Sequence, residues 1–151
     1  MRDILVEPNP VLKQVSEPVK LPLSKEDKAI LDEMYSWLKE NTDKAIGLAA
    51  VQIGILKRMC VIKIKDAGNY KLVNPKIVKH SQNCTHIPEG CLSVKEEIND
   101  PVKRYATAMV VGYDAITNKN VTINASGLLA RCLQHEIDHM DGIEFTDRIE
   151  K

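Results

Sequence analysis

The chain has 151 residues, of which 44% are hydrophobic and 28% charged, and its 21 Lys and Arg are balanced by 21 Asp and Glu. This length fits a single domain, residues 1–151, and the balanced charge excludes a strong field favouring nucleic acid or an anionic membrane. The N-terminus lacks the apolar core of a signal peptide, and the longest nearly apolar run, residues 47–56, is too short to span a bilayer. We therefore expect a cytoplasmic monomer with reduced cysteines.

The first predicted element is a helix that begins after residue 24. The segment "SKED", from Ser24 to Asp27, resembles a capping box with Asp in place of the commoner Glu. The apolar positions that follow recur with a period of 3.6 residues: Ile30, Leu31, Met34, Trp37 and Leu38. The helix is predicted to end near Asn41.

Two strand pairs are predicted in the middle of the chain. Residues 58–65 and 71–79 flank the turn "DAGN", and Pro75 is expected to push the second of these strands to a sheet edge. Residues 106–114 and 121–125 flank "AITNKN" and form the second pair.

A second helix is predicted from about Gly127 to a stop at Gly142. Strands between two separated helices, without βαβ alternation, indicate the α+β class, with antiparallel strands around the helix of the C-terminal half. This helix carries "QHEIDH", in which His135 and His139 share one face and can bind a single metal ion, with Glu136 beside the first.

A catalytic metal site usually has three protein ligands and an open position, so a third ligand is needed. Cys132 is excluded as a partner of His139, because seven helical residues separate them by about 10 Å along the axis. The metzincin pattern fails because Phe145 stands where the third histidine is required. The downstream carboxylates Glu144 and Glu150 lie too close to the chain end to form a second ligand helix.

An upstream segment, "CTHIPEGCLSV", offers four other donors: Cys84, His86, Glu89 and Cys91. Spacing alone does not choose among them. Chemistry favours a cysteine, because a thiolate is a strong ligand once a metal lowers its pKa. Gly90 also allows the backbone to approach a ligand closely.

Three blocks together, "GLAAVQIG" (47–54), "EGCLS" (89–93) and "QHEIDH" (134–139), closely resemble the motifs of peptide deformylases in order and separation. The resemblance extends over nearly the whole chain. It implies that Cys91 is the third ligand of one divalent metal ion, with Fe(II) used in the cell and Zn, Ni or Co able to substitute.

The resemblance also implies an activity, removal of the formyl group from the N-formylmethionine of nascent peptides, with release of formate. A metal-activated water attacks the formyl carbon, and Glu136 takes its proton and returns it to the leaving amine. The Gln52 side-chain amide and the Leu92 backbone N–H are implied as donors to the formyl oxygen.

Substrate binding is implied for a further set of residues that form an apolar slot for methionine and hold the extended peptide by strand addition: Ile46, Gly47, Ile87, Glu89, Gly90, Leu128 and Cys132. For Leu128 and Cys132, ordinary core packing is an equal alternative. Arg104 and Asp138 resemble, with Glu89, a charged cluster that braces the metal loop against the helix. The other His and Cys residues are expected to be two solvent-facing imidazoles, a core thiol and a loop thiol: His80, His86, Cys60 and Cys84.

The chain departs from the family pattern at four positions that leave peptide preference open: Ala45, Val51, Lys95 and Ile98. Many bacterial members continue into a long helix used in ribosome docking, whereas this chain ends at Lys151, so ribosome docking is not carried over. Two other classes compete. An Fe(II) oxygenase would use two histidines with a carboxylate such as Glu89 or Asp138, and a structural zinc domain would favour more cysteines.

Overall fold

The computed structural model describes residues 1–149 and contains two α-helices and seven strands in that range. In chain order they are α1 (Lys25–Glu40), β1 (Gly47–Ala49), β2 (Met59–Ile64), β3 (Gly68–His80), β4 (Cys84–Ile87), β5 (Val102–Tyr105), β6 (Thr107–Asp114), β7 (Lys119–Ser126) and α2 (Gly127–Met140). Short 3-10 helices lie at Pro10–Lys13 (η1), Ala50–Ile53 (η2) and Phe145–Arg148 (η3). The predicted α+β class is confirmed.

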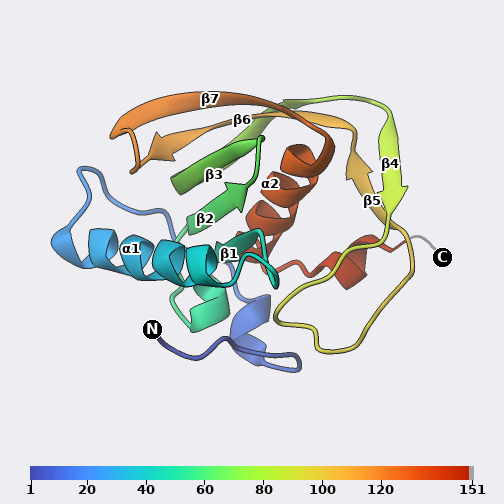
Figure 1. Ribbon diagram of the computed structural model, residues 1–151, viewed down its shortest axis with the longest axis horizontal. Coiled ribbons are helices and arrows are strands. Elements are labelled where there is room, and N and C mark those ends of the chain that lie inside the picture. The colour runs from blue at the N-terminus through green and yellow to red at the C-terminus, as the bar shows by residue number, and fades with distance from the viewer. Residues whose placement is uncertain (150–151) are drawn as a thin grey trace.

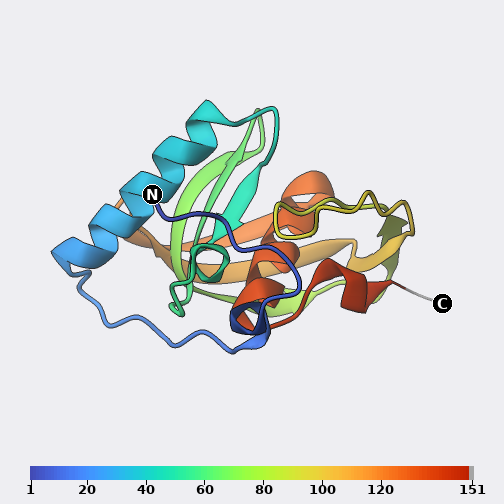
Figure 2. The ribbon, with the colours of Figure 1, turned by 90° about the horizontal axis from the view of Figure 1, so that it is seen from below.

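Five strands form one antiparallel sheet in the order β1-β2-β3-β6-β7, and β4 pairs with β5 in a separate two-stranded sheet. The large sheet curves around α2, and α1 lies against its β1–β2 end (Figure 1). The segment after β4 and the segment after α2 both run beside α2 (Figure 2). These two segments therefore border the helix that carries the histidines.

β2 is buried on both faces and separates the two apolar cores. Cys60 and Ile62 pack into a core with α2, whereas Met59 and Val61 pack into a core with α1. Successive side chains of a strand point to opposite faces, so the continuous run "MCVI" supplies both cores at once. The core on the α2 side thereby fixes α2, the helix that carries His135 and His139, against the sheet.

The predicted first helix is confirmed as α1. The Ser24 side chain accepts a hydrogen bond from the Asp27 backbone N–H at 3.0 Å, which satisfies one of the unpaired amides of the first turn. The Asp27 carboxylate is buried and pairs with Lys57 Nζ at 2.6 Å. The helix ends at Glu40, as the sequence predicted to within one residue.

The expectation that Pro75 pushes its strand to an edge is wrong. β3 is the central strand, paired with β2 on one side and β6 on the other. The register against β6 shifts between Val73 and Lys76, so that Pro75, which has no N–H to donate, sits in the irregular stretch. Asn74 turns there with a φ of 52° and exchanges two hydrogen bonds with the backbone of Val19.

The α2 helix begins and ends close to the predicted glycines. Gly127 has a φ of +56° and Gly142 a φ of +74°, both in the left-handed region that favours glycine. A Cβ at Gly142 would also collide with the carbonyl group of Lys13. Cys84 was expected to lie in a loop, but it is the first residue of β4. β4 pairs with β5, which lies beyond a long intervening segment, so no local pattern indicates the pairing.

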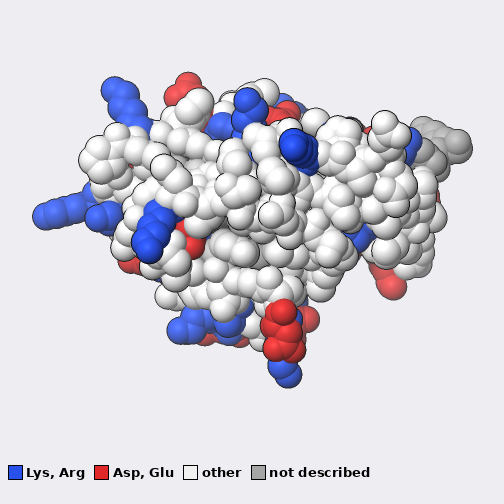
Figure 3. Space-filling model, turned by 90° about the horizontal axis from the view of Figure 1, so that it is seen from above, with Lys and Arg blue, Asp and Glu red and all other residues white. Residues whose placement is uncertain are grey.

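No helix among the described residues is long and apolar enough to cross a membrane. Figure 3 shows Lys and Arg interspersed with Asp and Glu on the face seen from above, with uncharged surface between them. This face therefore offers no concentrated charge of one sign.

Candidate metal centre and substrate cleft

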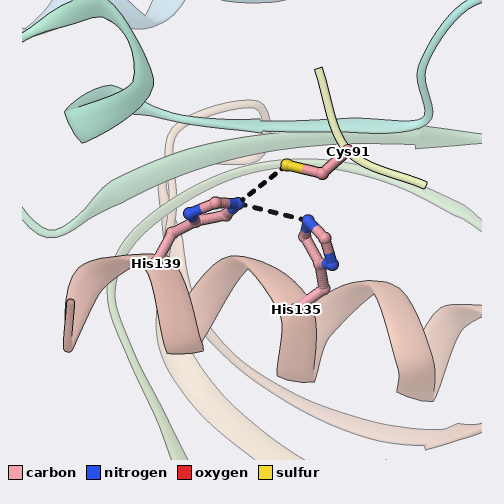
Figure 4. Close-up of side chains that lie close together, drawn as sticks. All are labelled: Cys91, His135 and His139. Atoms are coloured by element: carbon pink, nitrogen blue, oxygen red, sulfur yellow. Dashed lines mark hydrogen bonds between the residues drawn. The ribbon is translucent and has the colours of Figure 1, made fainter. Parts of the chain in front are cut away.

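Three side chains meet at the open side of α2. His139 Nε2 lies 3.2 Å from His135 Nε2 and 3.3 Å from Cys91 Sγ, and the three donor atoms point toward one another (Figure 4). The histidines are one helical turn apart, and Cys91 comes from the segment that follows β4. Of the four upstream donors that the sequence offered, only Cys91 joins the His135–His139 cluster within the described residues.

The spacing of this cluster fits one small divalent cation. Ligands bound at 2.0–2.3 Å in tetrahedral directions are separated from each other by about 3.3–3.7 Å, close to the distances between these donors. Two imidazoles and one thiolate are a set that suits Zn, Fe, Co or Ni, and they leave a fourth direction open.

The pKa values of the two imidazoles move in opposite directions. Burial disfavours charge on both, but hydrogen bonds to Cys91 and Glu89 raise the pKa of His135 well above its ordinary value. Burial and the neighbouring charge of His135 lower the pKa of His139 well below its ordinary value. Without a cation, the cluster therefore holds its positive charge on His135, while His139 stays neutral and can offer a lone pair to a metal.

Glu89 holds the segment between β4 and β5, which carries Cys91 and is called the metal segment below, against α2. Its carboxylate accepts hydrogen bonds from Arg104 Nε and Nη2, both at 2.9 Å, and from Arg131 Nη2 at 2.8 Å, and lies 3.0 Å from His135 Nδ1. Burial would raise the pKa of Glu89, but the hydrogen bonds from His135 and Arg104 lower it to about 2. An ionised Glu89 fixes the outer nitrogen of His135, so that its Nε2 faces the cluster.

Arg104, on β5, extends this hydrogen-bond network to Asp138, which lies on α2 together with His135. Its Nη1 donates to Asp138 Oδ2 at 2.5 Å, and the Asp138 carboxylate also accepts from Arg148 at 3.0 and 3.1 Å. The structure therefore brings the expected trio of Glu89, Arg104 and Asp138 together. Neither Glu89 nor Asp138 belongs to the donor cluster, which removes the geometric basis of an oxygenase-type two-histidine-one-carboxylate site.

Gln52 joins β1 to the metal segment. Its Oε1 accepts from the Ala49 N–H at 2.9 Å, while its Nε2 lies 3.1 Å from Ser93 Oγ and 3.7 Å from Cys91 Sγ. The amide is thus anchored at its oxygen by Ala49 and at its nitrogen by Ser93, and the same nitrogen also faces Cys91 Sγ of the cluster. Leu92 lines the same cavity, and its backbone N–H has no hydrogen-bond acceptor among the described residues.

Glu136 is 1% exposed and lies beside the cluster, with Oε1 unpaired among the described residues. Burial raises its pKa to about 7, against the lowering effect of the positive charges of His135 and Arg104. Gly47 of β1 lies directly against it, because a Cβ there would come within 2.6 Å of Glu136 Oε2. A carboxyl group poised near neutrality is suited to both taking and giving a proton.

A cleft of about 730 Å³ opens beside the cluster, between the segment after α1, the metal segment and α2. Every residue that the sequence assigned to substrate binding lines it: Ile46, Gly47, Ile87, Glu89, Gly90, Leu128 and Cys132. Leu128 and Ile87 are 54% and 48% exposed, which leaves apolar surface free at the cleft, whereas Cys132 is buried. Burial, with the charge of Glu136, raises the pKa of the Cys132 thiol, which makes it a poor metal ligand.

The remaining histidines and cysteines are not members of the donor cluster. His80 and His86 are exposed, and the His80 ring stacks on Tyr105 at a centroid distance of 3.7 Å. Cys60 is buried in the core.

Two contributors to the site were missed from the sequence: Ser93 and Arg131. Ser93 is fully buried, and its hydroxyl accepts a hydrogen bond from the Gln52 side-chain amide. Arg131 lies one helical turn before His135, a spacing that signals a shared face, and binds both Glu89 and the Ile87 carbonyl.

The antiparallel α+β fold, with a Cys–His–His cluster at the base of an open cleft and a buried carboxyl beside it, defines a metallohydrolase-like enzyme site. Comparison with known families is more specific. The sequence profile of the family described as polypeptide deformylase matches residues 1–151, and the chain belongs to this family. The chain is thereby assigned to the metal-dependent enzymes that deformylate the N-termini of nascent proteins.

Individual relatives agree with this assignment. "Peptide deformylase 2" of Geobacillus stearothermophilus is 42% identical, over 99% of this chain and 89% of that protein. The structure of peptide deformylase from Thermotoga maritima superimposes with a TM-score of 0.89 at 30% identity and covers 100% of this chain and 99% of that one. The peptide deformylase of the Vibrio parahaemolyticus bacteriophage VP16T, solved with actinonin, gives 0.81 at 34% identity and covers 95% and 99%.

Proposed function

We propose that this chain, as a single catalytic domain, hydrolyses the formyl amide of N-formylmethionine at the N-terminus of nascent peptides and releases formate. The observation that carries the proposal is the position of the Cys91–His135–His139 cluster. It lies beside Glu136 and the Gln52 amide, at a cleft lined by apolar side chains. These are the parts that hydrolysis of a small amide requires.

Cys91, His135 and His139 would hold the cation, and Fe(II) is the proposed ion in the cell. When bound, such an ion acts as a Lewis acid toward the formyl oxygen and lowers the pKa of water toward neutrality. Glu89 supports the site by holding the outer nitrogen of His135, and Arg104 and Asp138 hold Glu89 in turn through the network of ion pairs.

Glu136 is the proposed general base and acid. Its carboxylate takes a proton from the attacking water as the water oxygen bonds to the formyl carbon. It then gives that proton to the leaving nitrogen as the carbon–nitrogen bond breaks, which yields formate and a free amine. Its burial supports this role, because the raised pKa of Glu136, about 7, makes both transfers accessible near neutral pH.

Gln52 and Leu92 are the proposed donors to the formyl oxygen. Negative charge develops on that oxygen in the tetrahedral intermediate, and preorganised N–H groups stabilise it. The Gln52 amide is held at its oxygen end by Ala49, so its N–H groups need little reorganisation. The Leu92 N–H has no acceptor among residues 1–149, which leaves it available.

The cleft residues would position the peptide. Ile87 and Leu128 contribute exposed apolar surface and Cys132 a buried wall for the methionine side chain, and the β1 edge at Ile46 and Gly47 offers backbone groups to an extended chain. Gly90 borders the cleft, where a Cβ would meet nothing within 4 Å. We propose that the enzyme acts in the cytoplasm as a monomer.

The test is direct. Metal-loaded protein is incubated with a short N-formyl-Met peptide or its N-acetyl counterpart, and formate and acetate are measured. Release of formate but little acetate is expected, because the extra methyl group would crowd the carbonyl carbon at the cluster. The Glu136→Gln protein serves as the matched negative control, and equal turnover of the two peptides would contradict the proposal.

A further inference from the structure

A second carboxylate lies behind the other proposed metal ligand. Glu144 Oε1 is 3.9 Å from His139 Nδ1, the nitrogen on the side of the ring away from Cys91 and His135. Both side chains are only 1% exposed. His139 Nδ1 and both Glu144 carboxylate oxygens lack a hydrogen-bond partner within the described part of the chain.

The chemistry of the ring makes this pairing significant. An imidazole that gives its Nε2 lone pair to a cation carries its proton on Nδ1, and a buried N–H needs an acceptor. His135 already has one, because Glu89 lies 3.0 Å from its Nδ1. Within residues 1–149, Glu144 is the carboxylate paired with His139 Nδ1, and the 3.9 Å separation is about 1 Å longer than a hydrogen bond, a gap that a rotation of the Glu144 side chain would have to close.

The turn after α2 places Glu144 there. The Gly142 and Ile143 backbone amides donate to the carbonyls of His139 and Asp138 at 3.2 and 2.9 Å, which folds the chain back onto the helix end. The Glu144 backbone N–H is in turn held by Asp147 Oδ2 at 2.9 Å. Glu144 is therefore fixed by the same backbone that ends the helix of the two histidines.

Glu144 lies in surroundings that disfavour a charged carboxylate. Burial and the nearby carboxyl of Glu7 outweigh the attraction of Lys13, whose Nζ lies 3.6 Å from Glu7 Oε1. A buried carboxyl group beside a second carboxyl costs stability unless the two share a proton, and an apolar residue of similar volume would avoid that cost. Such local conflicts are typical of functional positions.

We propose that Glu144 is a positioning residue for His139: it accepts the Nδ1–H and fixes the ring with Nε2 toward the cation. The inference rests on the proposed function only in taking Cys91, His135 and His139 as the metal ligands. Glu144 is thus the counterpart of Glu89, so that each imidazole is held by its own carboxylate from behind. The segment after α2 thus supplies no metal ligand, but it supplies a carboxylate that binds the outer nitrogen of a ligand.

The experiment compares Zn²⁺ affinity, measured with a chromophoric chelator as competitor, in three variants of the full chain. Glu144→Met keeps the size but removes the acceptor and is expected to weaken Zn²⁺ binding about 10–100-fold. Glu144→Gln keeps a carbonyl acceptor and is expected to bind Zn²⁺ nearly as tightly as the unchanged protein. Glu7→Gln is the matched control, because it removes the neighbouring charge but leaves Glu144 in place, and is also expected to retain affinity.

Unchanged affinity in Glu144→Met would overturn the proposal. Equal weakening in Glu144→Gln would also overturn it, because the effect would then come from charge rather than from an acceptor. A separate measurement on the unchanged, Zn²⁺-loaded protein does not depend on the folding of any variant. Nitrogen-15 NMR should show a slowly exchanging proton on His139 Nδ1, and an unprotonated Nδ1 would refute the inference. Because the readouts use Zn²⁺ alone, a failure to release formate would count against the proposed function and not against this positioning role.

Discussion

Gly47 lies against the carboxylate of Glu136, so closely that a Cβ built on Gly47 would come within 2.6 Å of Glu136 Oε2 and 3.0 Å of Cys132 Sγ. β1 therefore sets the position of the proposed general base from across the cleft. The contact links the first sequence block to the last in physical terms, because the absent side chain of one makes room for the acid group of the other.

From this contact we predict that Gly47→Ala displaces the Glu136 carboxylate. Loss of orientation of a catalytic group by about 1 Å costs on the order of 10²-fold in rate. We expect kcat/KM for formyl-Met peptide to fall by about that factor, with metal content unchanged, because none of the three ligands is touched. Wild-type kcat/KM in the folded variant would show that the carboxylate does not depend on this contact.

Glu136→Gln tests the acid–base role itself. The amide keeps the size and hydrogen-bonding capacity of the side chain but cannot take the proton, and general acid–base groups contribute roughly 10²–10⁴ in rate. We expect a loss toward the upper end of that range, because one group serves in both directions, with full metal content. Cys91→Ala is the contrasting variant and should lose metal and activity together. A metal-free Glu136→Gln protein, or a nearly fully active one, would contradict the assignment.

Much of the fold could be predicted from local pattern. The spacing of Leu31, Met34 and Leu38 predicted α1, and the paired glycines predicted the limits of α2. The three residues of β1 were missed, because so short a strand has no measurable periodicity. The pairing of β4 with β5 was missed because the metal segment separates them in the chain. Pro75 misled because a register shift lets a central strand accommodate a residue without an N–H.

The site shows the same division. The three donors, Glu136 and Gln52 could be predicted as one site, because each lies in one of three sequence blocks with a recognisable combination of residue types. Arg131 and Glu144 lie outside these blocks. Their partners lie on other elements or behind a ring, and only the path of the backbone after Gly142 shows that Glu144 faces His139.

The buried Glu144 carboxyl predicts a pH dependence of stability in the metal-free protein. Burial, with the neighbouring carboxyl of Glu7, raises the pKa of Glu144 from 4.5 to about 7. The folded state thus binds this proton more tightly than the unfolded state. The resulting stabilisation is fully present below pH 4.5 and is lost as the pH rises to about 7. The free energy of unfolding of the unchanged protein, relative to Glu144→Gln, should therefore decrease across this window in urea titrations. Parallel curves for the two proteins would count against a raised pKa.

Arg131 is predicted to brace the cleft. Its guanidinium donates to Glu89 Oε2 at 2.8 Å and to the Ile87 carbonyl at 2.7 Å, so it ties β4 and the metal segment to α2. Arg131→Met keeps much of the apolar stem but removes these bonds, and bonds to charged groups contribute about 1.5–3 kcal/mol each. We expect a lower melting temperature and a raised KM for formyl-Met peptide. Arg58→Met, which removes an ion pair with Asp141 and bonds to the carbonyls of Ser16 and Met140 outside the cleft lining, is the matched control and should leave KM unchanged.

The final prediction concerns the proposed metal and its thiolate ligand. Cys91 is only partly buried and borders the open cleft, so oxygen can reach its sulfur. A thiolate beside an oxidisable cation is prone to oxidation toward sulfenic and sulfinic acids, which no longer bind the metal well. Activity of anaerobically prepared, Fe(II)-loaded protein should therefore decay in air, whereas protein loaded with Ni²⁺ or Co²⁺ should keep its activity over the same period. Mass spectrometry should find added oxygen on Cys91, while Cys60 in the core stays unmodified as an internal control. Air-stable activity of the Fe(II) protein, or oxidation that spares Cys91, would contradict the prediction.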